Sequence, residues 1–167
     1  MKRILLLLIL ITSFITKSQT INFHPSSSPA EIVFLTKAAQ KYINDDYVTI
    51  IYQPYSPLNR AFNGVTYQYN KYLYQISLSV FRTDNILRTW ALFHEVGHII
   101  DFHKGRLEQM PIRWKGEEYK EYLDWKDRPW EKSAEKHARK LWKDIMGFPA
   151  PFELLNSSEI EFKCEHK

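Results

Sequence analysis

Two histidines and a glutamate stand at a spacing that can bind and activate a metal ion. The sequence reads His94-Glu95-Val96-Gly97-His98, inside a stretch from Trp90 to Ile100 that is otherwise uncharged. On an α-helix, positions 94 and 98 lie one turn apart and project from the same face. Two neutral imidazoles so placed can both bind one Zn²⁺ at about 2.0–2.1 Å. Glu95 is then positioned to accept a proton from a metal-bound water.

The helix that carries this motif is predicted to run from Asn85 to about His103. Thr83 or Asp84 provides the N-cap, and Lys104-Gly105 ends the helix. Tryptophan and phenylalanine flank the motif, so we expect a buried helix whose few polar groups are the histidines and the glutamate. An amphipathic surface helix with two exposed histidines is the alternative interpretation.

A third protein ligand must come from another part of the chain, because a catalytic zinc site takes three ligands and keeps one position for water. A second helix is predicted over residues 130–146. Glu131 lies in its first turn, on the side that carries small residues and can approach the motif helix closely, and we expect it to be the third ligand. Glu135, one turn later, is an alternative ligand or a hydrogen-bond partner of His94 or His98.

Other polar residues near the motif have more than one interpretation. Asp101 follows His98 by three residues on the same helix face. It either orients a ligand histidine by a hydrogen bond or forms an ion pair with a neighbouring arginine or lysine. Tyr119, Tyr122 or His137 can donate to a developing oxyanion, and the sequence does not choose among them.

Hydrophobic spacing predicts the elements that must position the motif helix. A Ser/Pro-rich leader over residues 22–28 precedes a first helix, which Ser28 caps together with Glu31. This first helix is expected over residues 29–44. A strand over 47–52, a loop over 54–64, and a hairpin of strands 65–69 and 72–80 follow it.

Two segments bear on access to the motif. One face of the strand 72–80 is expected to pack on the motif helix, while the other faces water or a cleft. Residues 106–128 are expected to be irregular, as a covering loop or as a lid that contacts a substrate.

Asp127 is the expected cap of the second helix. These elements predict an α+β fold with a small mixed or antiparallel sheet packed on the motif helix.

The N-terminus has the pattern of a secretory signal peptide. Met1-Lys2-Arg3 is positively charged, residues 4–15 are almost entirely apolar, and residues 17–20 are polar. An apolar run of this length is too short to cross a bilayer as a helix. We therefore expect residues 1–19 to be a signal peptide, residues 20–167 to be one domain, and the mature protein to be secreted or periplasmic in a bacterium, without stable membrane insertion.

The net charge bears on the expected binding partners, and the cysteine count bears on disulfide formation. Removal of residues 1–19 takes away Lys2, Arg3 and Lys17 and no acid, which lowers the formal net charge from +4 to +1. A nearly neutral domain gives no support for nucleic-acid binding. Cys164 is the single cysteine, so no internal disulfide can form. A peptide or protein substrate is the expected partner, and the oligomeric state is left open.

The motif and its distance to Glu131 resemble a known family. The segment 94–98 and the later pattern Pro129-Trp130-Glu131, with Ala134 and Ala138 following, resemble the small gluzincins of the ImmA/IrrE type. That resemblance covers two helices and implies a zincin-like fold, with the histidines and Glu131 as zinc ligands and Glu95 as base. Glu135 and His137 depart from the family pattern, which has Asn and Phe there.

The expected function is therefore that of a secreted zinc-dependent metallopeptidase. A zinc-activated water would hydrolyse a peptide bond with Glu95 as general base. Two alternatives remain: a catalytically silent binding module of the cell envelope with the same fold, and a hydrolase of cell-wall peptides with the same chemistry.

Overall fold

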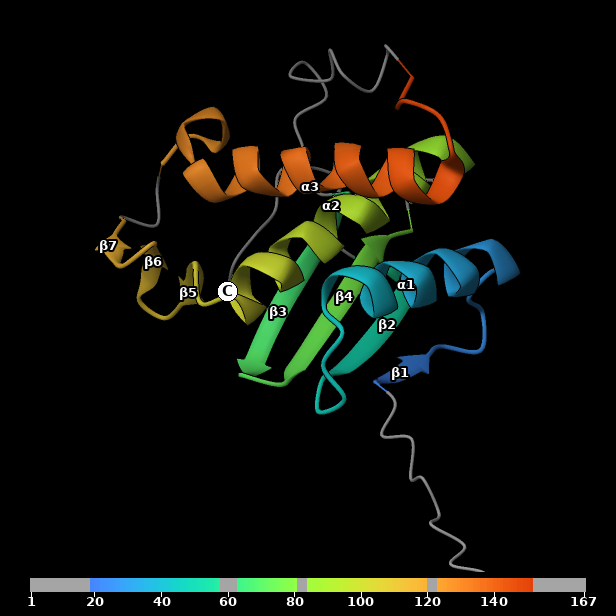
Figure 1. Ribbon diagram of the computed structural model, residues 1–167, viewed down its shortest axis with the longest axis horizontal. Helices are drawn as coiled ribbons and strands as arrows, with labels where there is room; N and C mark the ends of the chain where they lie inside the picture. Colours follow the sequence, from blue (N-terminus) through green and yellow to red (C-terminus); the bar gives the residue numbers. More distant parts are fainter. Residues whose placement is uncertain (1–18, 58–62, 81–83, 120–122, 152–167) are drawn as a thin grey trace, which may run out of the picture.

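Helix α2 (Asn85–His103) lies at the centre of the molecule, as Figure 1 shows for the computed structural model. The structure describes residues 19–57, 63–80, 84–119 and 123–151. The proposed signal peptide, except for Gln19, and Tyr122 lie outside these residues. The bounds of α2 agree with the prediction, and its N-cap is Asp84, whose side chain accepts a hydrogen bond from the Leu87 N–H at 2.8 Å. The helix therefore begins and ends at the residues that were predicted to cap it, Asp84 and Lys104.

Four strands form a mixed sheet in the order β1-β2-β4-β3. β1 (Thr20–Phe23), β2 (Thr49–Ser56) and β4 (Leu73–Ser79) are parallel, and β3 (Gly64–Asn70) pairs with β4 in the antiparallel direction. The β3–β4 hairpin and the α+β class are confirmed. β4 lies inside the sheet, and β3 forms one of its two edges.

Three layers are stacked around α2. Helix α1 (Pro29–Tyr42) and α2 lie side by side over one face of the sheet, and α3 (Pro129–Met146) crosses α2 on the side away from the sheet (Figure 1). Fifteen of the 19 residues of α2 are buried, which confirms the buried helix and excludes the surface interpretation. Aromatic contacts join α2 to both neighbouring layers: Tyr74 of β4 stacks on Phe102, and Phe93 meets Trp142 of α3 edge to face.

A second, small sheet follows α2, where an irregular segment was expected. β5 (Leu107–Gln109), β6 (Ile112–Trp114) and β7 (Glu117–Glu118) are antiparallel, and the one-turn 3₁₀ helix η1 (Trp125–Asp127) precedes α3. Lys115 and Gly116 both have positive φ, so they form the tight turn between β6 and β7. The prediction failed because lysine is an uncommon residue at such a turn position.

Other differences from the sequence-based expectation have local causes. The leader expected over residues 22–28 overlaps β1, a short, half-exposed strand on the sheet edge that the sequence analysis did not predict. β2 continues through Pro54, because the register with β4 shifts there and the missing N–H of proline is tolerated at a bulge. Asp127 is not the cap of α3: the N-cap is Arg128, without a side-chain hydrogen bond.

The strand β4 also differs from the expectation at its second face. Ser77 and Ser79 are buried and do not face water. Arg88 of α2 donates to the carbonyl oxygen of Ser79 at 3.2 Å, so this end of the strand is packed against the helix.

Within the described residues, no helix is both long enough and apolar enough to cross a bilayer.

Gly97 permits the close contact between α2 and α3. A Cβ atom at Gly97 would lie 2.8 Å from the carbonyl oxygen of Ala134 and 2.9 Å from its Cα. Real Cβ atoms essentially never come so close to backbone atoms. Ala134 and Ala138 are fully buried, so small residues on α3 meet the glycine on α2. The side chains of the two helices can therefore converge over a short distance.

A buried ion pair joins α2 to α1 and to the sheet. The Arg88 guanidinium donates to Glu31 Oε1 at 2.8 Å and to the Pro54 carbonyl oxygen at 2.7 Å. Burial alone would raise the pKa of Glu31, but hydrogen bonds from the Ser28 N–H and from Arg88 hold it below 4.5. Ser28 and Glu31 also form the predicted capping box of α1. The first turn of α2 is thus tied to two other elements.

Replacing Gly97 with alanine should destabilise the protein. The added Cβ must push α3 away from α2, and we expect the free energy of unfolding to fall by about 1–3 kcal/mol in a urea titration. Ser133→Ala, which adds no atom at the contact, should change it by less than about 0.5 kcal/mol. Equal stability of Gly97→Ala and the wild type would contradict the close contact.

Replacing Arg88 with methionine should leave the Glu31 carboxylate buried without its cation. We expect a loss of about 3–5 kcal/mol in unfolding free energy. The double variant Arg88→Met/Glu31→Gln should recover a large part of that loss, because no buried charge remains. A double-mutant cycle by denaturant unfolding measures the coupling, and a double variant as unstable as Arg88→Met would refute it.

Candidate metal centre

His94 and His98 lie one turn apart on α2 and turn their rings toward each other. Their Nε2 atoms are 3.2 Å apart, and the ring centroids are separated by 4.9 Å. The two side chains are at most 1 % exposed. The helix places both imidazoles on the face that α3 crosses, which follows from their four-residue spacing.

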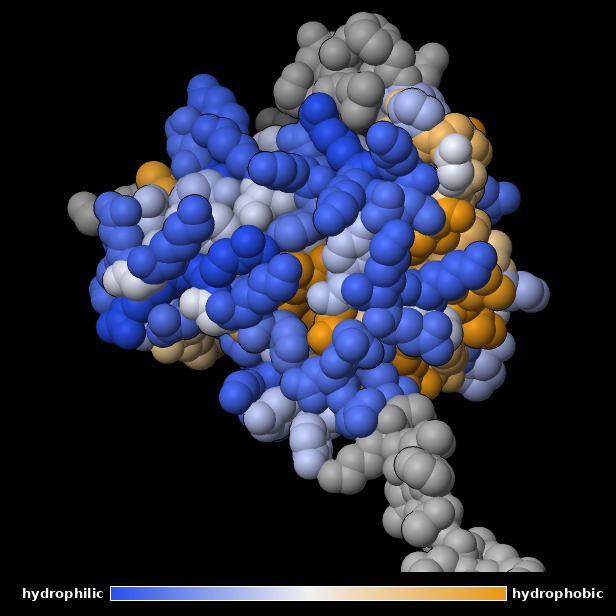
Figure 2. Space-filling view, in the orientation of Figure 1, coloured by the Kyte–Doolittle hydropathy of each residue, from blue (hydrophilic) through white to orange (hydrophobic). Residues whose placement is uncertain are grey.

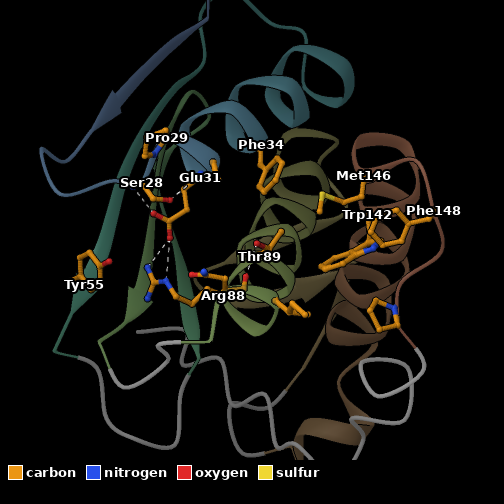
Figure 3. A pocket seen from close by; sticks show the side chains of 14 residues that line it. Ser28, Pro29, Glu31, Phe34, Tyr55, Arg88, Thr89, Trp142, Met146 and Phe148 are labelled. Atoms are coloured by element: carbon orange, nitrogen blue, oxygen red, sulfur yellow. Dashed lines mark hydrogen bonds and ion pairs between the residues drawn. The ribbon is translucent and has the colours of Figure 1, made fainter.

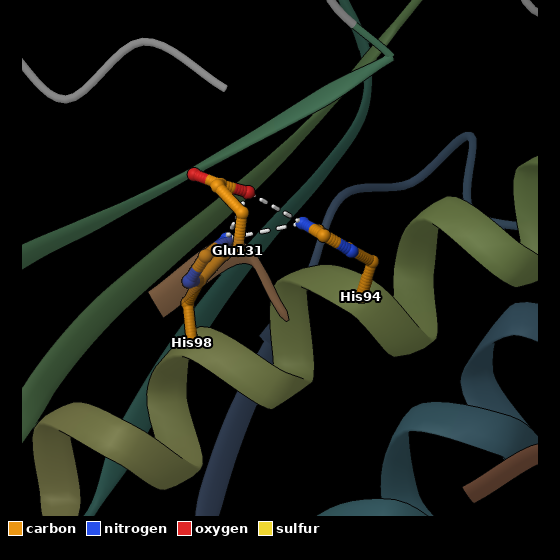
Figure 4. A group of neighbouring side chains, drawn as sticks. All are labelled: His94, His98 and Glu131. Atoms are coloured by element: carbon orange, nitrogen blue, oxygen red, sulfur yellow. Dashed lines mark hydrogen bonds and ion pairs between the residues drawn. The ribbon is translucent and has the colours of Figure 1, made fainter. Parts of the chain in front are cut away.

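Glu131 reaches the same point from the first turn of α3. Its Oε2 atom lies 3.0 Å from His94 Nε2 and 3.4 Å from His98 Nε2. Figure 4 shows the carboxylate directed at the two rings. One ligand atom from each of the three residues lies within 4.8 Å of the others, and all three residues are buried. The close helix contact at Gly97 makes this convergence possible.

The three atoms fit a metal ion by distance. Ligands at 2.0–2.1 Å in tetrahedral directions around one ion lie about 3.3–3.4 Å from one another. The separations here, 3.0, 3.2 and 3.4 Å, are close to that value. Two imidazole nitrogens and one carboxylate oxygen also form a known donor set for a catalytic zinc. His94, His98 and Glu131 are therefore a group that could bind a metal ion.

The charges around the group favour a cation. Burial alone would lower the pKa of His98, but the carboxylates of Glu131, Glu95 and Asp101 raise it above 6.5. An anionic carboxylate as deeply buried as that of Glu131 requires a compensating positive charge. A divalent ion between the three side chains would provide it.

Glu95 is held beside the group by the sheet. Thr66 of β3 donates through its hydroxyl to Glu95 Oε2 at 2.7 Å, and also contacts the Glu95 carbonyl oxygen at 3.1 Å. A Cβ at Gly64 would lie 2.8 Å from Glu95 Oε1, so glycine at the start of β3 leaves room for the carboxylate. Two residues of the edge strand thus fix the orientation of the predicted base.

The other sequence candidates, Glu135 and Asp101, form ion pairs with arginines. Glu135 is partly exposed and pairs with Arg139 on its own helix, so the structure brings Glu131 and not Glu135 to the histidines. Asp101 is fully buried and pairs with Arg106, which agrees with the ion-pair interpretation.

Two of the three candidate oxyanion donors have other partners. His137 Nε2 lies 2.9 Å from an Arg106 nitrogen and 3.4 Å from an Asp101 oxygen. The Tyr119 hydroxyl donates to Glu117 at 3.1 Å, and its ring packs edge to face on Trp130. Tyr122 lies outside the described residues.

Sequence reasoning missed Thr66, Gly64 and Arg106. Thr66 and Gly64 fix the position of the Glu95 side chain from about 30 residues earlier in the chain. No local sequence pattern predicts a contact between residues so far apart. For Asp101 the sequence analysis predicted an ion pair without naming the cation, which is Arg106, five residues later and just beyond the helix end.

No protein-family model, no curated protein and no solved structure matches this chain.

The three-residue group should bind one divalent metal ion per chain. We expect His94→Ala and Glu131→Ala to abolish stoichiometric metal binding, measured by inductively coupled plasma mass spectrometry on dialysed protein. Glu135→Ala, on the same helix but outside the group, should retain it. A chelator should lower the melting temperature of the wild type by several degrees, because the metal stabilises only the folded state. Full metal content in Glu131→Ala would exclude this ligand set.

Proposed function

We propose that this protein is a zinc-dependent metallopeptidase with a zincin-like fold, in which His94, His98 and Glu131 hold the metal. The observation that carries the proposal is the convergence of three buried ligand atoms from two helices, next to a carboxylate fixed by β3. The resemblance of the two helices to the ImmA/IrrE gluzincins supports the same chemistry. Zinc fits the donor set because it accepts imidazole nitrogen and carboxylate oxygen in tetrahedral geometry.

Glu95 would act as the general base. Zinc held by His94, His98 and Glu131 would supply a water of lowered pKa, about 7, and would polarise the scissile carbonyl. Glu95 would accept a proton from the attacking water and later donate it to the leaving amine. Thr66 keeps the Glu95 carboxylate in one orientation, since its hydroxyl donates to Oε2. The base and the two histidine ligands therefore lie on one helix, while Glu131 comes from α3.

The sheet suggests how a peptide would lie. β4 lies between β2 and β3 and has no open edge with which an extended substrate could pair. β3 is the edge strand, and it carries Thr66 and Gly64 next to Glu95. An extended peptide can add to β3 by main-chain hydrogen bonds. One backbone group of this edge, the Gln68 N–H, already donates to the Gln109 side chain at 3.0 Å.

A binding module without turnover is the second candidate. The side chains of Glu95, His94, His98 and Glu131 are at most 1 % exposed, and structural zinc sites are closed in this way. Metal content together with hydrolysis of casein and of peptidoglycan peptides separates the two functions. Metal binding without cleavage of either substrate would favour the module, and cleavage of peptidoglycan peptides alone would identify a cell-wall peptide hydrolase.

The first 19 residues have the charge and apolar pattern of a signal peptide, which supports a site of action outside the cytoplasm. We propose that the chain is exported and that the peptidase acts outside the cytoplasm. Detection of the mature chain, by mass spectrometry, with its new N-terminus near Gln19 in the exported fraction would support this, and an intact Met1 terminus would contradict it.

Two substitutions separate the roles of Glu95 and Thr66. Glu95→Gln should bind zinc as the wild type does while hydrolysis of a peptide library falls by at least about 10³-fold, because the base is lost. Thr66→Val keeps the shape but removes the hydroxyl, so we expect kcat to fall about tenfold with KM and zinc content unchanged. Unchanged hydrolysis by Glu95→Gln would reject the assigned base.

A further inference from the structure

Basic side chains form a row along the outer face of α3. Lys132, Lys136, Arg139 and Lys143 follow one another at intervals of four, three and four residues, so they share one face of the helix. All four are exposed, and the opposite face of α3, which includes Ala138, is buried. The row rises by about 16 Å along the helix. Because α3 lies on the side of α2 away from the sheet, the row points outward (Figure 1).

Two lysines of α1 extend this row. Lys37 and Lys41 are exposed and border an open groove between α1 and α3. Lys41 pairs with Asp144 of α3 at 3.0 Å, and the Lys140 ammonium lies 5.1 Å from the centre of the Tyr42 ring. The lysines of both helices therefore belong to one surface. We call it the basic face, and it comprises Lys37, Lys41, Lys132, Lys136, Arg139, Lys140 and Lys143.

The basic face has a large excess of positive charge. Its seven lysines and arginines adjoin two acids, Glu135 and Asp144, because the other two acids of α1 and α3, Glu31 and Glu131, are buried. Seven minus two gives a net charge of +5, although the whole chain from residue 20 onward has +1. A helix face that only meets water usually mixes both signs, whereas a face of one sign attracts the opposite charge.

Much of this charge is not neutralised within the protein. The two acids each pair with one base of the basic face. Lys132, Lys136 and Lys143 have no ion-pair partner among the residues that the structure describes. An anionic partner would therefore meet three lysines whose charge is available.

An apolar surface adjoins one end of the basic face. Phe148, just after the last turn of α3, is 50 % exposed and packs edge to face on Trp142 (Figure 3). Ile86, in the first turn of α2, is equally exposed, and both residues line one cavity together with the first turn of α1. Figure 2 shows hydrophobic side chains gathered at this end of α1 and α3, beside hydrophilic ones. We call this surface, which contains Phe148 and Ile86, the apolar end.

Basic residues beside exposed aromatic and aliphatic side chains are typical of proteins that bind the surface of an anionic membrane. Lysines attract the lipid phosphates, and apolar side chains enter the boundary between head groups and acyl chains. A soluble polyanion would use the basic face alone and would leave Phe148 and Ile86 in water. The apolar end therefore favours a bilayer as the partner.

We propose that the basic face and the apolar end bind the surface of a bilayer that contains anionic phospholipids. Lys132, Lys136 and Lys143 contact the phosphate groups, and Phe148 enters the head-group region. Such binding is peripheral and needs no membrane-spanning helix. It depends neither on the metal nor on the proposed peptidase activity.

Sedimentation with vesicles tests the proposal. The protein used begins at Thr20, because the apolar run of residues 4–15 would itself enter a bilayer, and every element that the structure describes lies after residue 19. We expect vesicles with about 30 % phosphatidylglycerol to bind it at least about tenfold more tightly than vesicles of pure phosphatidylcholine. Raising the salt from about 0.1 M to about 1 M should release it, because the Debye length falls from about 10 Å to about 3 Å.

Two variants separate the contributions of charge and apolar contact. Each lysine near an anionic surface strengthens binding about fivefold, so Lys132→Glu/Lys136→Glu/Lys143→Glu should bind anionic vesicles at least about 50-fold more weakly. Phe148→Ser, which removes the apolar contact and no charge, should bind them about threefold to tenfold more weakly.

The matched control changes the net charge by the same amount elsewhere. It replaces three exposed lysines outside α1 and α3 in one variant, Lys71→Glu/Lys104→Glu/Lys115→Glu. Its binding to anionic vesicles should fall by less than about threefold, because charges farther than a Debye length from the bilayer are screened. Thermal unfolding verifies that each variant is folded.

Three results would overturn the proposal. The first is equal binding of the protein to the two kinds of vesicle. The second is an equal loss of binding in the two triple variants, which would reveal a general effect of net charge. The third is binding to soluble polyphosphate without binding to anionic vesicles, which would identify a polyanion as the partner.

Discussion

The contact between α2 and α3 at Gly97 is the constraint on which the candidate metal centre depends. The motif supplies two imidazoles from one helix, but the third ligand can reach them only if α3 lies almost against the backbone of α2. Gly97 on one side and Ala134 on the other provide that proximity. The separations of 3.0–3.4 Å between the three ligand atoms are thus a result of helix packing. Gly97, one of the three residues between the histidines, therefore has a structural role of its own.

The buried carboxylates along α2 are compensated in two different ways. Glu31 and Asp101 are each paired with an arginine, Arg88 or Arg106, at the two ends of the helix. Glu131, in the middle, meets two histidines. Arginine neutralises a carboxylate permanently, because it stays protonated. A carboxylate that faces two imidazoles instead remains available to a metal ion. The partner of each buried carboxylate therefore distinguishes a structural ion pair from a candidate ligand site.

The parts of the fold that could be predicted have local signals. The bounds of α2, its Asp84 cap, the β3–β4 hairpin and the Ser28 capping box all follow from spacing over a few residues. The choice of Glu131 over Glu135 rested on small residues one turn away, which is also local. Thr66 could not be found this way, because its contact with Glu95 depends on which edge of the sheet β3 occupies. β1 and the three short strands after α2 have too few residues for a periodic pattern.

The wide separation of the ligands in the chain has a consequence for biogenesis. A nascent or translocating polypeptide that has exposed only residues up to His98 offers a metal two imidazoles and no carboxylate from α3. The group of three ligands would be completed only after the chain has grown by the 33 residues from His98 to Glu131 (131 − 98) and α3 has docked. If the group binds a metal ion as proposed, loading would be a late event of maturation, in the compartment where the complete chain folds.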